Sequence, residues 1–258
     1  MTTNNPPEAV PQPEQPEIRI EPQPVRVHLP EIQPIVTYAI IGITSLVFLA
    51  QLATQQLLGY DLPVAIGVKY NALIDSGQYW RLITPVLLHG NFLHIGFNMY
   101  AVYILGREIE RFYGHGRFLL LYLAGGFTGS VASYLLTAAP SLGASTATFG
   151  LLTAYGVLGY RNRHIFGRQS QRIVRNVIQV ALINFLLGLS PGIDNWGHLG
   201  GTIGGIALAW FGGPELEVSG QPPDLYIRDK TPSNRFFAAF ISVVGFFALL
   251  VMLLPGAA

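Results

Sequence analysis

The sequence predicts an all-α membrane protein that crosses the bilayer seven times, with its N-terminus in the cytoplasm. Half of the 258 residues are hydrophobic and only 11% are charged, whereas soluble domains carry about 25% charged residues. The apolar residues are gathered in seven stretches, most of them close to the roughly 20 residues that a membrane helix needs. The basic residues are concentrated on one side of these stretches, which sets the orientation.

The seven apolar stretches differ in strength. The third and seventh are continuous apolar runs, whereas the fourth and sixth are short and rich in glycine, so they would be weak spans on their own. A functional site is therefore expected near the fourth and sixth. The predicted spans cover residues 35–57, 86–106, 118–137, 145–160, 173–190, 196–212 and 236–254.

The orientation follows from the distribution of Lys and Arg between the predicted spans. Cytoplasmic segments of membrane proteins carry an excess of these residues. With the N-terminus inside, 13 of the 15 basic residues fall on the cytoplasmic side, and only Lys69 and Arg81 fall outside. An odd number of spans then places the C-terminus outside.

The segments outside the spans complete the domain organisation. Residues 1–34 contain 9 of the 18 prolines, and such a segment cannot bury enough apolar surface to offset its ordering entropy. We predict a disordered cytoplasmic tail there and expect no cleavable signal peptide, because the N-terminus is polar. A helical core over 35–212, a cytoplasmic linker over 213–235 and a last span with a short tail over 236–258 follow.

Composition also narrows the possible chemistry. The net charge of +1 gives no basic surface for nucleic acid, so no such partner is expected. The absence of cysteine excludes disulfides, thiolate metal sites and thiol catalysis.

Three polar residues from separate spans are expected at a similar depth. His94 lies early in the predicted second span together with His89, Ser145 opens the fourth, and His198 lies near the start of the sixth. All three spans run inward from the outer face, and an ionisable residue inside a span indicates function. The remaining histidines fall in cytoplasmic segments and are expected to be solvated: His28, His115 and His164.

The spacing of these residues suggests separate roles. A serine hydroxyl is a weak nucleophile until a base takes its proton, and histidine is the usual base. His94 and Asn98 are four residues apart and share a helix face, so they can donate two hydrogen bonds to an oxyanion. His198 is then the candidate base for Ser145. Glycines at every fourth position beside His198 would let the fourth and sixth helices approach closely.

Other interpretations of the same residues stay open. Ser145 can be a packing residue, and a membrane histidine can serve only as a structural hydrogen-bonding group. A metal site is disfavoured because His89 and His94, five residues apart, lie about 140° apart around a helix. A small transporter or proton relay is disfavoured because the chain has neither two matching halves nor a carboxylate at mid-membrane.

Four motifs resemble those of the rhomboid family of intramembrane serine proteases, across residues 35–254. Each motif is weak alone, but their order and their positions on the predicted helices make the combination specific. They are "HGNFLHIGFNMY" with His94 and Asn98, "GASTATFGL" with Ser145, "GHLGGTIGG" with His198, and "YWRLITP" in the first loop.

The resemblance implies a six-helix rhomboid core with a seventh, C-terminal transmembrane helix. It implies that Ser145 attacks the scissile carbonyl and that His198 acts as general base and then acid, in a dyad without Asp. His94, Asn98 and the Ser145 backbone N–H would hold the oxyanion. No metal or other cofactor is implied.

The resemblance also assigns two supporting positions and shows one departure. Phe149 would support the catalytic histidine, and Glu110 would lock helix and loop contacts at the inner end of the second helix. Thr146 departs from the family pattern, which usually has glycine after the nucleophile. Its β-branched side chain either narrows the room for substrate or points away from it.

The implied substrates are single-pass membrane proteins, cut within the lipid bilayer near their outer ends. The loop over residues 189–195 would cap the site or be a simple short turn, and the fifth helix would serve as a lateral gate. A bacterial inner membrane is the expected location. The alternative is a catalytically inactive rhomboid-like protein that binds transmembrane helices.

Overall fold

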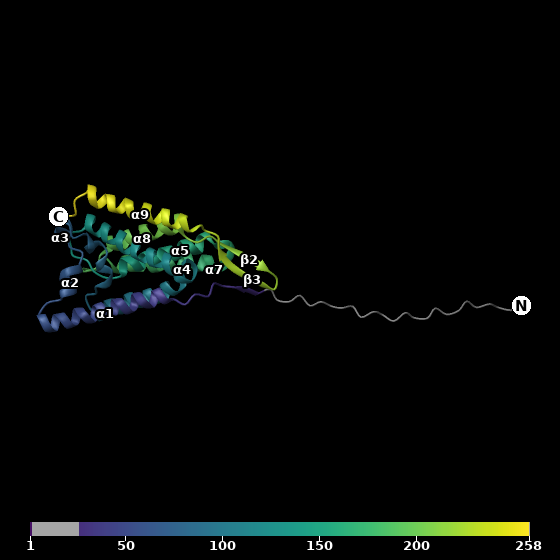
Figure 1. The fold of residues 1–258 in the computed structure, drawn as a ribbon, viewed down its shortest axis with the longest axis horizontal. Coiled ribbons are helices and arrows are strands. Elements are labelled where there is room, and N and C mark those ends of the chain that lie inside the picture. Colours follow the sequence, from purple (N-terminus) through teal and green to yellow (C-terminus); the bar gives the residue numbers. More distant parts are fainter. Residues whose placement is uncertain (2–25, 258) are drawn as a thin grey trace.

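The protein is a bundle of long helices with a small sheet at one end (Figure 1). The structure is a computed structural model that describes residue 1 and residues 26–257. Most of the predicted disordered tail therefore lies outside the described residues. The helices of the first loop and the C-terminus lie at the end of the bundle opposite the sheet.

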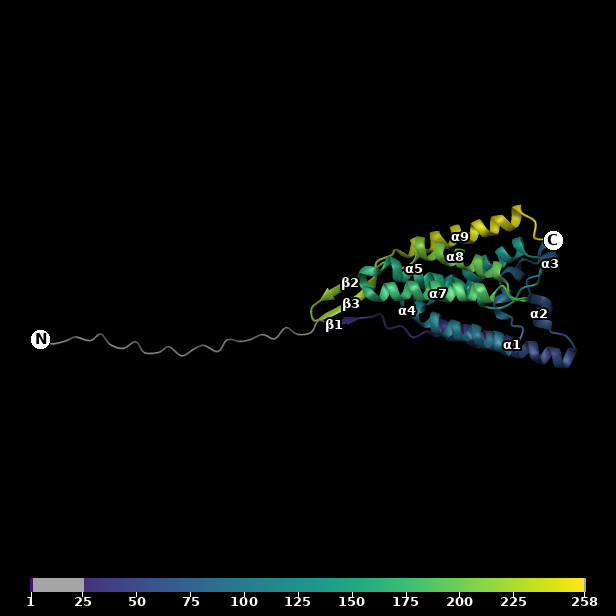
Figure 2. The ribbon, with the colours of Figure 1, turned by 180° about the vertical axis from the view of Figure 1, so that it is seen from behind.

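The long helices cover the predicted spans, with the second and third spans both in α4, which begins at Phe92. They are α1 (Ile35–Leu58), α4 (Phe92–Leu136), α5 (Ser145–Arg161), α7 (Arg168–Leu187), α8 (Asn195–Gly212) and α9 (Ser233–Leu253). Figure 2 shows α1 and α9 on opposite sides of the bundle, with α5 and α8 between them. The shorter helical segments are α2 (Leu62–Gly67), α3 (Asn71–Asp75), η1 (Tyr79–Leu82), η2 (Thr84–Leu87) and α6 (Arg163–Phe166).

Helix α4 consists of two helical segments that meet at Gly114. This residue has φ 72° and ψ 166°, a conformation that favours glycine. A Cβ atom added to Gly106 would lie 3.1 Å from Phe118 Cζ, although a straight helix would separate these residues by roughly 18 Å. The chain therefore reverses at Gly114, which makes residues 92–113 and 115–136 two neighbouring helices.

Three of the described helices are long and apolar enough to cross a membrane: α1, α4 and α9. The mainly helical fold agrees with the predicted all-α class. The six-plus-one arrangement of spans and the cytoplasmic position of the N-terminus stay predictions.

Glycines bring α5 and α8 into backbone contact, as expected from their spacing. A Cβ atom added to Gly201 would lie 2.1 Å from Thr146 O, and one added to Gly205 would lie 2.3 Å from Gly150 O. No larger residue fits at either position. Helix α4 packs against the same pair, since Gly125 and Gly150 face each other across the α4–α5 contact.

Glu110 fixes the start of α1 against α4. Its buried carboxylate accepts hydrogen bonds from the backbone N–H groups of Val36 and Thr37 (both 2.9 Å) and from Thr37 Oγ1 (2.6 Å). His115 Nδ1 lies 2.5 Å from the same carboxylate, because the reversal at Gly114 returns the chain to it. His115 and His164 are both exposed, as expected for solvated residues, and each also makes a contact: the His164 Nε2 atom lies 2.9 Å from Leu216 O.

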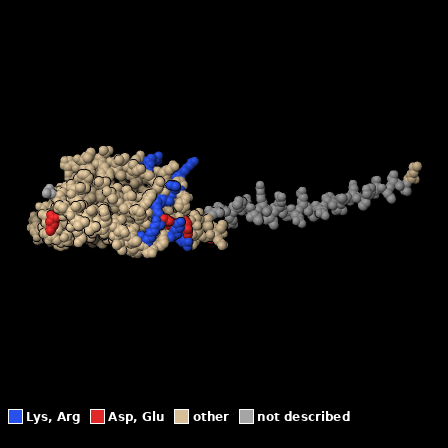
Figure 3. Space-filling model, turned by 90° about the horizontal axis from the view of Figure 1, so that it is seen from above, with Lys and Arg blue, Asp and Glu red and all other residues tan. Residues whose placement is uncertain are grey.

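A three-stranded sheet lies where the sequence predicted only tail and linker. Strands β2 (Leu216–Gln221) and β3 (Asp224–Asp229) form an antiparallel hairpin, and β1 (Arg26–His28) pairs with β3 in parallel. Figure 3 shows Lys and Arg side chains gathered in a band near this end of the molecule. The positive-inside rule assigns the end of the molecule that carries this band to the cytoplasmic side.

Candidate active site

The structure brings Ser145 and His198 together, as the sequence predicted. Ser145 is the first residue of α5, and His198 lies in the first turn of α8. The Ser145 Oγ and His198 Nε2 atoms are 3.0 Å apart, which is hydrogen-bonding distance. The backbone contact between α5 and α8 places both helix starts at the same level.

Two aromatic rings fix the orientation of the His198 imidazole. The Phe149 ring, one turn after Ser145, stacks on it with ring centroids 4.3 Å apart and planes 16° apart. Phe185 of α7 packs edge-on against Phe149 at 5.3 Å. Because His198 is only 6% exposed, this stack leaves its Nε2 atom directed at Ser145. The role expected for Phe149 agrees with this geometry.

The described residues provide no carboxylate partner for the other ring nitrogen of His198. Its Nδ1 atom is buried without a hydrogen-bond partner in the part of the chain that the structure describes. The nearby Asp194 instead caps α8, with its Oδ1 atom accepting from Gly197 N at 2.8 Å. The geometry is that of a serine–histidine pair.

The start of α5 is a suitable place to stabilise negative charge. The first N–H groups of a helix have no intrahelical acceptor, and the helix dipole is positive at this end. Ser145 N–H is one of these groups. The His94 ring is adjacent, since a Cβ atom added to Gly143 would lie 2.6 Å from His94 Nε2. Gly143 has φ +125°. Glycine is therefore needed there both for this backbone conformation and for the close approach of the His94 ring.

Asn98 lies one turn beyond His94 on α4, and both belong to the predicted oxyanion site. The Asn98 side chain is buried, and its Nδ2 atom donates to His94 O at 2.9 Å. A primary amide has two N–H donors, so this bond occupies one of them.

His89 does not lie in a helix, contrary to the prediction that the second span begins before it. Helix α4 begins at Phe92 because Asn91 caps it, accepting from His94 N at 2.9 Å. The buried His89 ring packs against His94 with centroids 5.0 Å apart. Its Nε2 atom is 3.4 Å from Ala144 N, so His89 supports the segment that leads to Ser145.

Lys69 is a supporting residue that the sequence did not indicate. Its backbone pairs with that of Ser141 at 3.0 and 3.1 Å, and its Nζ atom donates to Thr137 O (2.7 Å) and Ala139 O (2.9 Å). Burial lowers the pKa of the Lys69 ammonium to about 8. The one available signal was an isolated lysine in an otherwise apolar segment on the side with few basic residues.

The rest of the first loop makes this support rigid. The buried Arg81 donates to Val68 O (2.9 Å) and Ala65 O (2.7 Å), and Trp80 Nε1 donates to Ile66 O at 3.1 Å. At the other end of the loop, Pro85 O accepts from Gly143 N at 2.9 Å. The loop therefore holds the segment before Ser145 on two sides.

Thr146 points away from Ser145, which decides between the two orientations left open above. A Cβ atom added to Gly129 of α4 would lie 2.5 Å from Thr146 Cβ, and one added to Gly197 of α8 would lie 2.9 Å from Thr146 Cγ2. Thr146 is 6% exposed. Its side chain thus fills the junction of α4, α5 and α8, where glycines make room for it.

We expect Thr146→Gly to lower stability without opening the site. The substitution leaves a cavity and places glycine in a helix, which together cost about 2 kcal/mol. Thermal unfolding in detergent, compared with the conservative variant Thr146→Ser, measures this loss. A Thr146→Gly protein as stable as the original chain would contradict the packing role.

Comparison with known sequences gives a consistent result. A family model described as the Rhomboid domain matches residues 76–215. "Rhomboid protease GluP" of Bacillus subtilis is 41% identical over 191 residues, which cover 73% of this chain and 37% of that protein. "RHOMBOID-like protein 9, chloroplastic" of Arabidopsis thaliana is 30% identical over 197 residues, covering 71% and 45%.

A third relative extends the range of organisms. "Rhomboid-like protease 1" of Toxoplasma gondii is 38% identical over 165 residues, which cover 60% of this chain and 55% of that protein. The chain spans less than two thirds of the length of each of these three relatives. The matched domain includes Ser145, His198, His94 and Asn98. The chain belongs to the rhomboid family and is an integral membrane protein.

Proposed function

We propose that this protein is an intramembrane serine endopeptidase that cleaves single-pass membrane proteins near the outer membrane face. The observation that carries the proposal is the 3.0 Å contact between Ser145 Oγ and His198 Nε2 at the start of α5. The relative named "Rhomboid protease GluP" supports the reaction class.

The proposed reaction proceeds through an acyl-enzyme. His198 Nε2 takes the proton from Ser145 Oγ as that oxygen attacks the scissile carbonyl carbon, forming a tetrahedral oxyanion. When the intermediate collapses, the C–N bond breaks and His198 gives its proton to the departing amine. Water then attacks the acyl-enzyme with His198 again as base, which releases the second product and restores Ser145.

The oxyanion would be held by donors from two helices. The Ser145 backbone N–H comes from the positive end of α5, and His94 contributes its ring N–H from α4. Asn98 contributes the amide N–H that His94 O does not occupy. Fixed donors aimed at developing charge are usually the largest single contribution to this kind of catalysis.

Substrate entry is proposed beside α7. This helix packs mainly on α5, and its Phe185 contacts the Phe149 ring that stacks on His198. Asn195 Nδ2 donates to Phe185 O at 3.2 Å, which ties the end of α7 to the start of α8. A lateral movement of α7, with the loop over residues 189–195, would open a path from the bilayer to Ser145.

The proposed setting is a bacterial inner membrane with the N-terminus in the cytoplasm. The Bacillus subtilis relative and the one-sided distribution of Lys and Arg support this setting. In this orientation the start of α5 lies toward the outer face, where water reaches the polar groups of the site.

The proposal is tested by cleavage of a model single-pass substrate in liposomes. We expect Ser145→Ala and His198→Ala to reduce kcat at least about 1,000-fold, because loss of either member removes nucleophilic attack. Ser133→Ala, which changes another buried serine, is the matched control and should keep full activity. Cleavage that persists in Ser145→Ala contradicts the proposal. A folded original chain that binds substrate helices but cuts none would support the inactive helix-binding alternative.

A second variant tests the oxyanion arrangement. Gly143→Ala is expected to displace the His94 ring and to lower kcat about 100-fold with little change in KM, as for loss of one oxyanion donor. Gly96→Ala is the matched control, since an added Cβ there meets nothing within 4 Å. Equal kcat values for Gly143→Ala and the original chain would show that His94 does not act at this position.

A further inference from the structure

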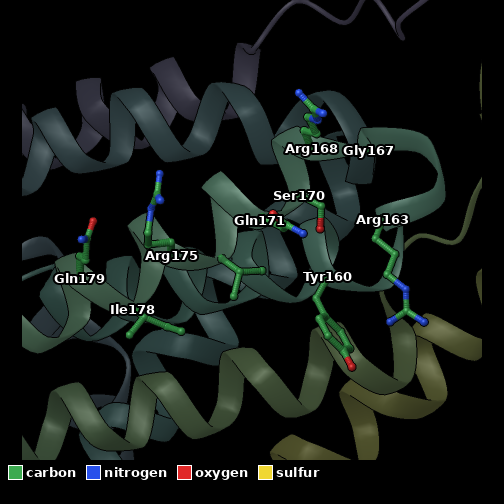
Figure 4. A pocket seen from close by; sticks show the side chains of 10 residues that line it. Tyr160, Arg163, Gly167, Arg168, Ser170, Gln171, Arg175, Ile178 and Gln179 are labelled. Carbon is green, nitrogen blue, oxygen red and sulfur yellow. The ribbon is translucent and has the colours of Figure 1, made fainter.

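A second site lies far from Ser145, at the sheet end of the bundle. A groove of about 770 Å³ runs between the end of α5, the short α6 and the first turns of α7 (Figure 4). Tyr160 of α5, which lines it, is four turns along the helix from Ser145, roughly 22 Å away. The groove is therefore separate from the proposed catalytic centre. The residues important to the argument are Tyr160, Arg163, Arg168, Val174, Arg175 and Ile178.

The arginines of the groove carry uncompensated charge. Within residues 26–257, Arg163, Arg168 and Arg175 form no ion pair with a carboxylate. Other arginines at this end do: Arg117 pairs with Asp229, and Arg161 with Glu215.

The Glu215 carboxylate at this end is already occupied by Arg161. Arg235 Nη1 also binds Glu215, at 2.8 Å. Burial raises the pKa of the Glu215 carboxyl, but Arg235, Arg161 and Lys230 outweigh burial and hold it below its usual range. This carboxylate is therefore committed to other cations and does not neutralise the groove.

The position of these arginines on α7 is unfavourable for the isolated helix. The N-terminus of a helix is positive, so it favours anions and disfavours Arg. Helix α7 begins at Arg168, and Arg175 follows within two turns, with no acidic residue in the first turn. A bound anion would interact with the free N–H groups and with the guanidinium groups together.

The other part of the groove is apolar. Val174 lies on α7 between Arg168 and Arg175, and Ile178 follows Arg175 by one turn and is 52% exposed. At the cationic end, the Arg163 guanidinium lies 5.5 Å from the Tyr160 ring centroid. Tyrosine and arginine are typical of the level of the lipid headgroups. The groove thus pairs a cationic end with an apolar end, which matches the two parts of a phospholipid.

We propose that this groove binds one anionic phospholipid. Its anionic headgroup is attracted by the charges of Arg163, Arg168 and Arg175, which line the groove, and its acyl chains lie along Val174 and Ile178. The positive-inside rule explains why basic residues occur on this side, but it does not require them to line a groove with an apolar extension. Because α7 packs mainly on α5, a lipid bound across their junction would hold α7 in place.

The test measures lipid binding by the full chain in a neutral detergent. Thermal unfolding is followed by tryptophan fluorescence while phosphatidylglycerol, phosphatidylcholine of the same acyl chains, or inorganic phosphate is added. We expect a saturable rise in Tm with phosphatidylglycerol only. A matching rise with inorganic phosphate would assign the site to a soluble anion, and no saturable effect of phosphatidylglycerol would overturn the proposal.

Two triple variants with the same change in charge separate the groove from general attraction. Arg163→Gln/Arg168→Gln/Arg175→Gln should weaken phosphatidylglycerol binding roughly 100-fold, since each arginine contributes about fivefold. Arg107→Gln/Arg111→Gln/Arg172→Gln removes three charges outside the groove and should keep the original affinity. Equal losses in both would contradict a defined site. If the first triple variant does not fold, Arg175→Gln against Arg172→Gln gives the same comparison, with about fivefold weaker binding expected.

Discussion

The backbone contact between α5 and α8 is the constraint on which the site depends. A Cβ atom at Gly201 or Gly205 would lie within 2.3 Å of a carbonyl oxygen of α5, so the helices approach as closely as glycine permits. Membrane helices lie in apolar lipid, so the hydrophobic effect does not drive them together. They associate largely through such close packing. This contact places the N-terminal ends of α5 and α8 at the same level of the bundle. The Ser145 Oγ and His198 Nε2 atoms are therefore 3.0 Å apart.

A second layer of support comes from the first loop, which holds the segment before Ser145. Lys69 binds carbonyl oxygens of residues 137 and 139, and Pro85 O binds Gly143 N. Gly143 connects the loop to the site, since its N–H binds Pro85 O and it also contacts the His94 ring. Its positive φ and this contact both exclude a side chain. Buried polar side chains of the loop thus position the backbone, whereas the proposed catalytic residues lie on the rigid helices.

The sequence predicted the features that depend on helical periodicity. The long helices and the Ser145–His198 pair follow from apolar runs and from glycines four residues apart. The burial of Lys69 and the position of His89 before α4 could not be predicted, because they depend on contacts with distant segments. Pairing of residues 26–28 with 224–226 is equally non-local. The direction of Thr146 depends on Gly129 and Gly197, which the sequence alone does not place beside it.

The central claim is that Ser145 is an activated nucleophile. The most direct measurement is reaction of the folded, detergent-solubilised chain with a fluorophosphonate, followed by mass-spectrometric mapping of the adduct. Such reagents form a covalent bond with a serine oxygen whose proton a nearby base can take. The account predicts one adduct, on Ser145, and almost none in the His198→Ala protein. An adduct on a different serine, or equal labelling of Ser145 without His198, would contradict it.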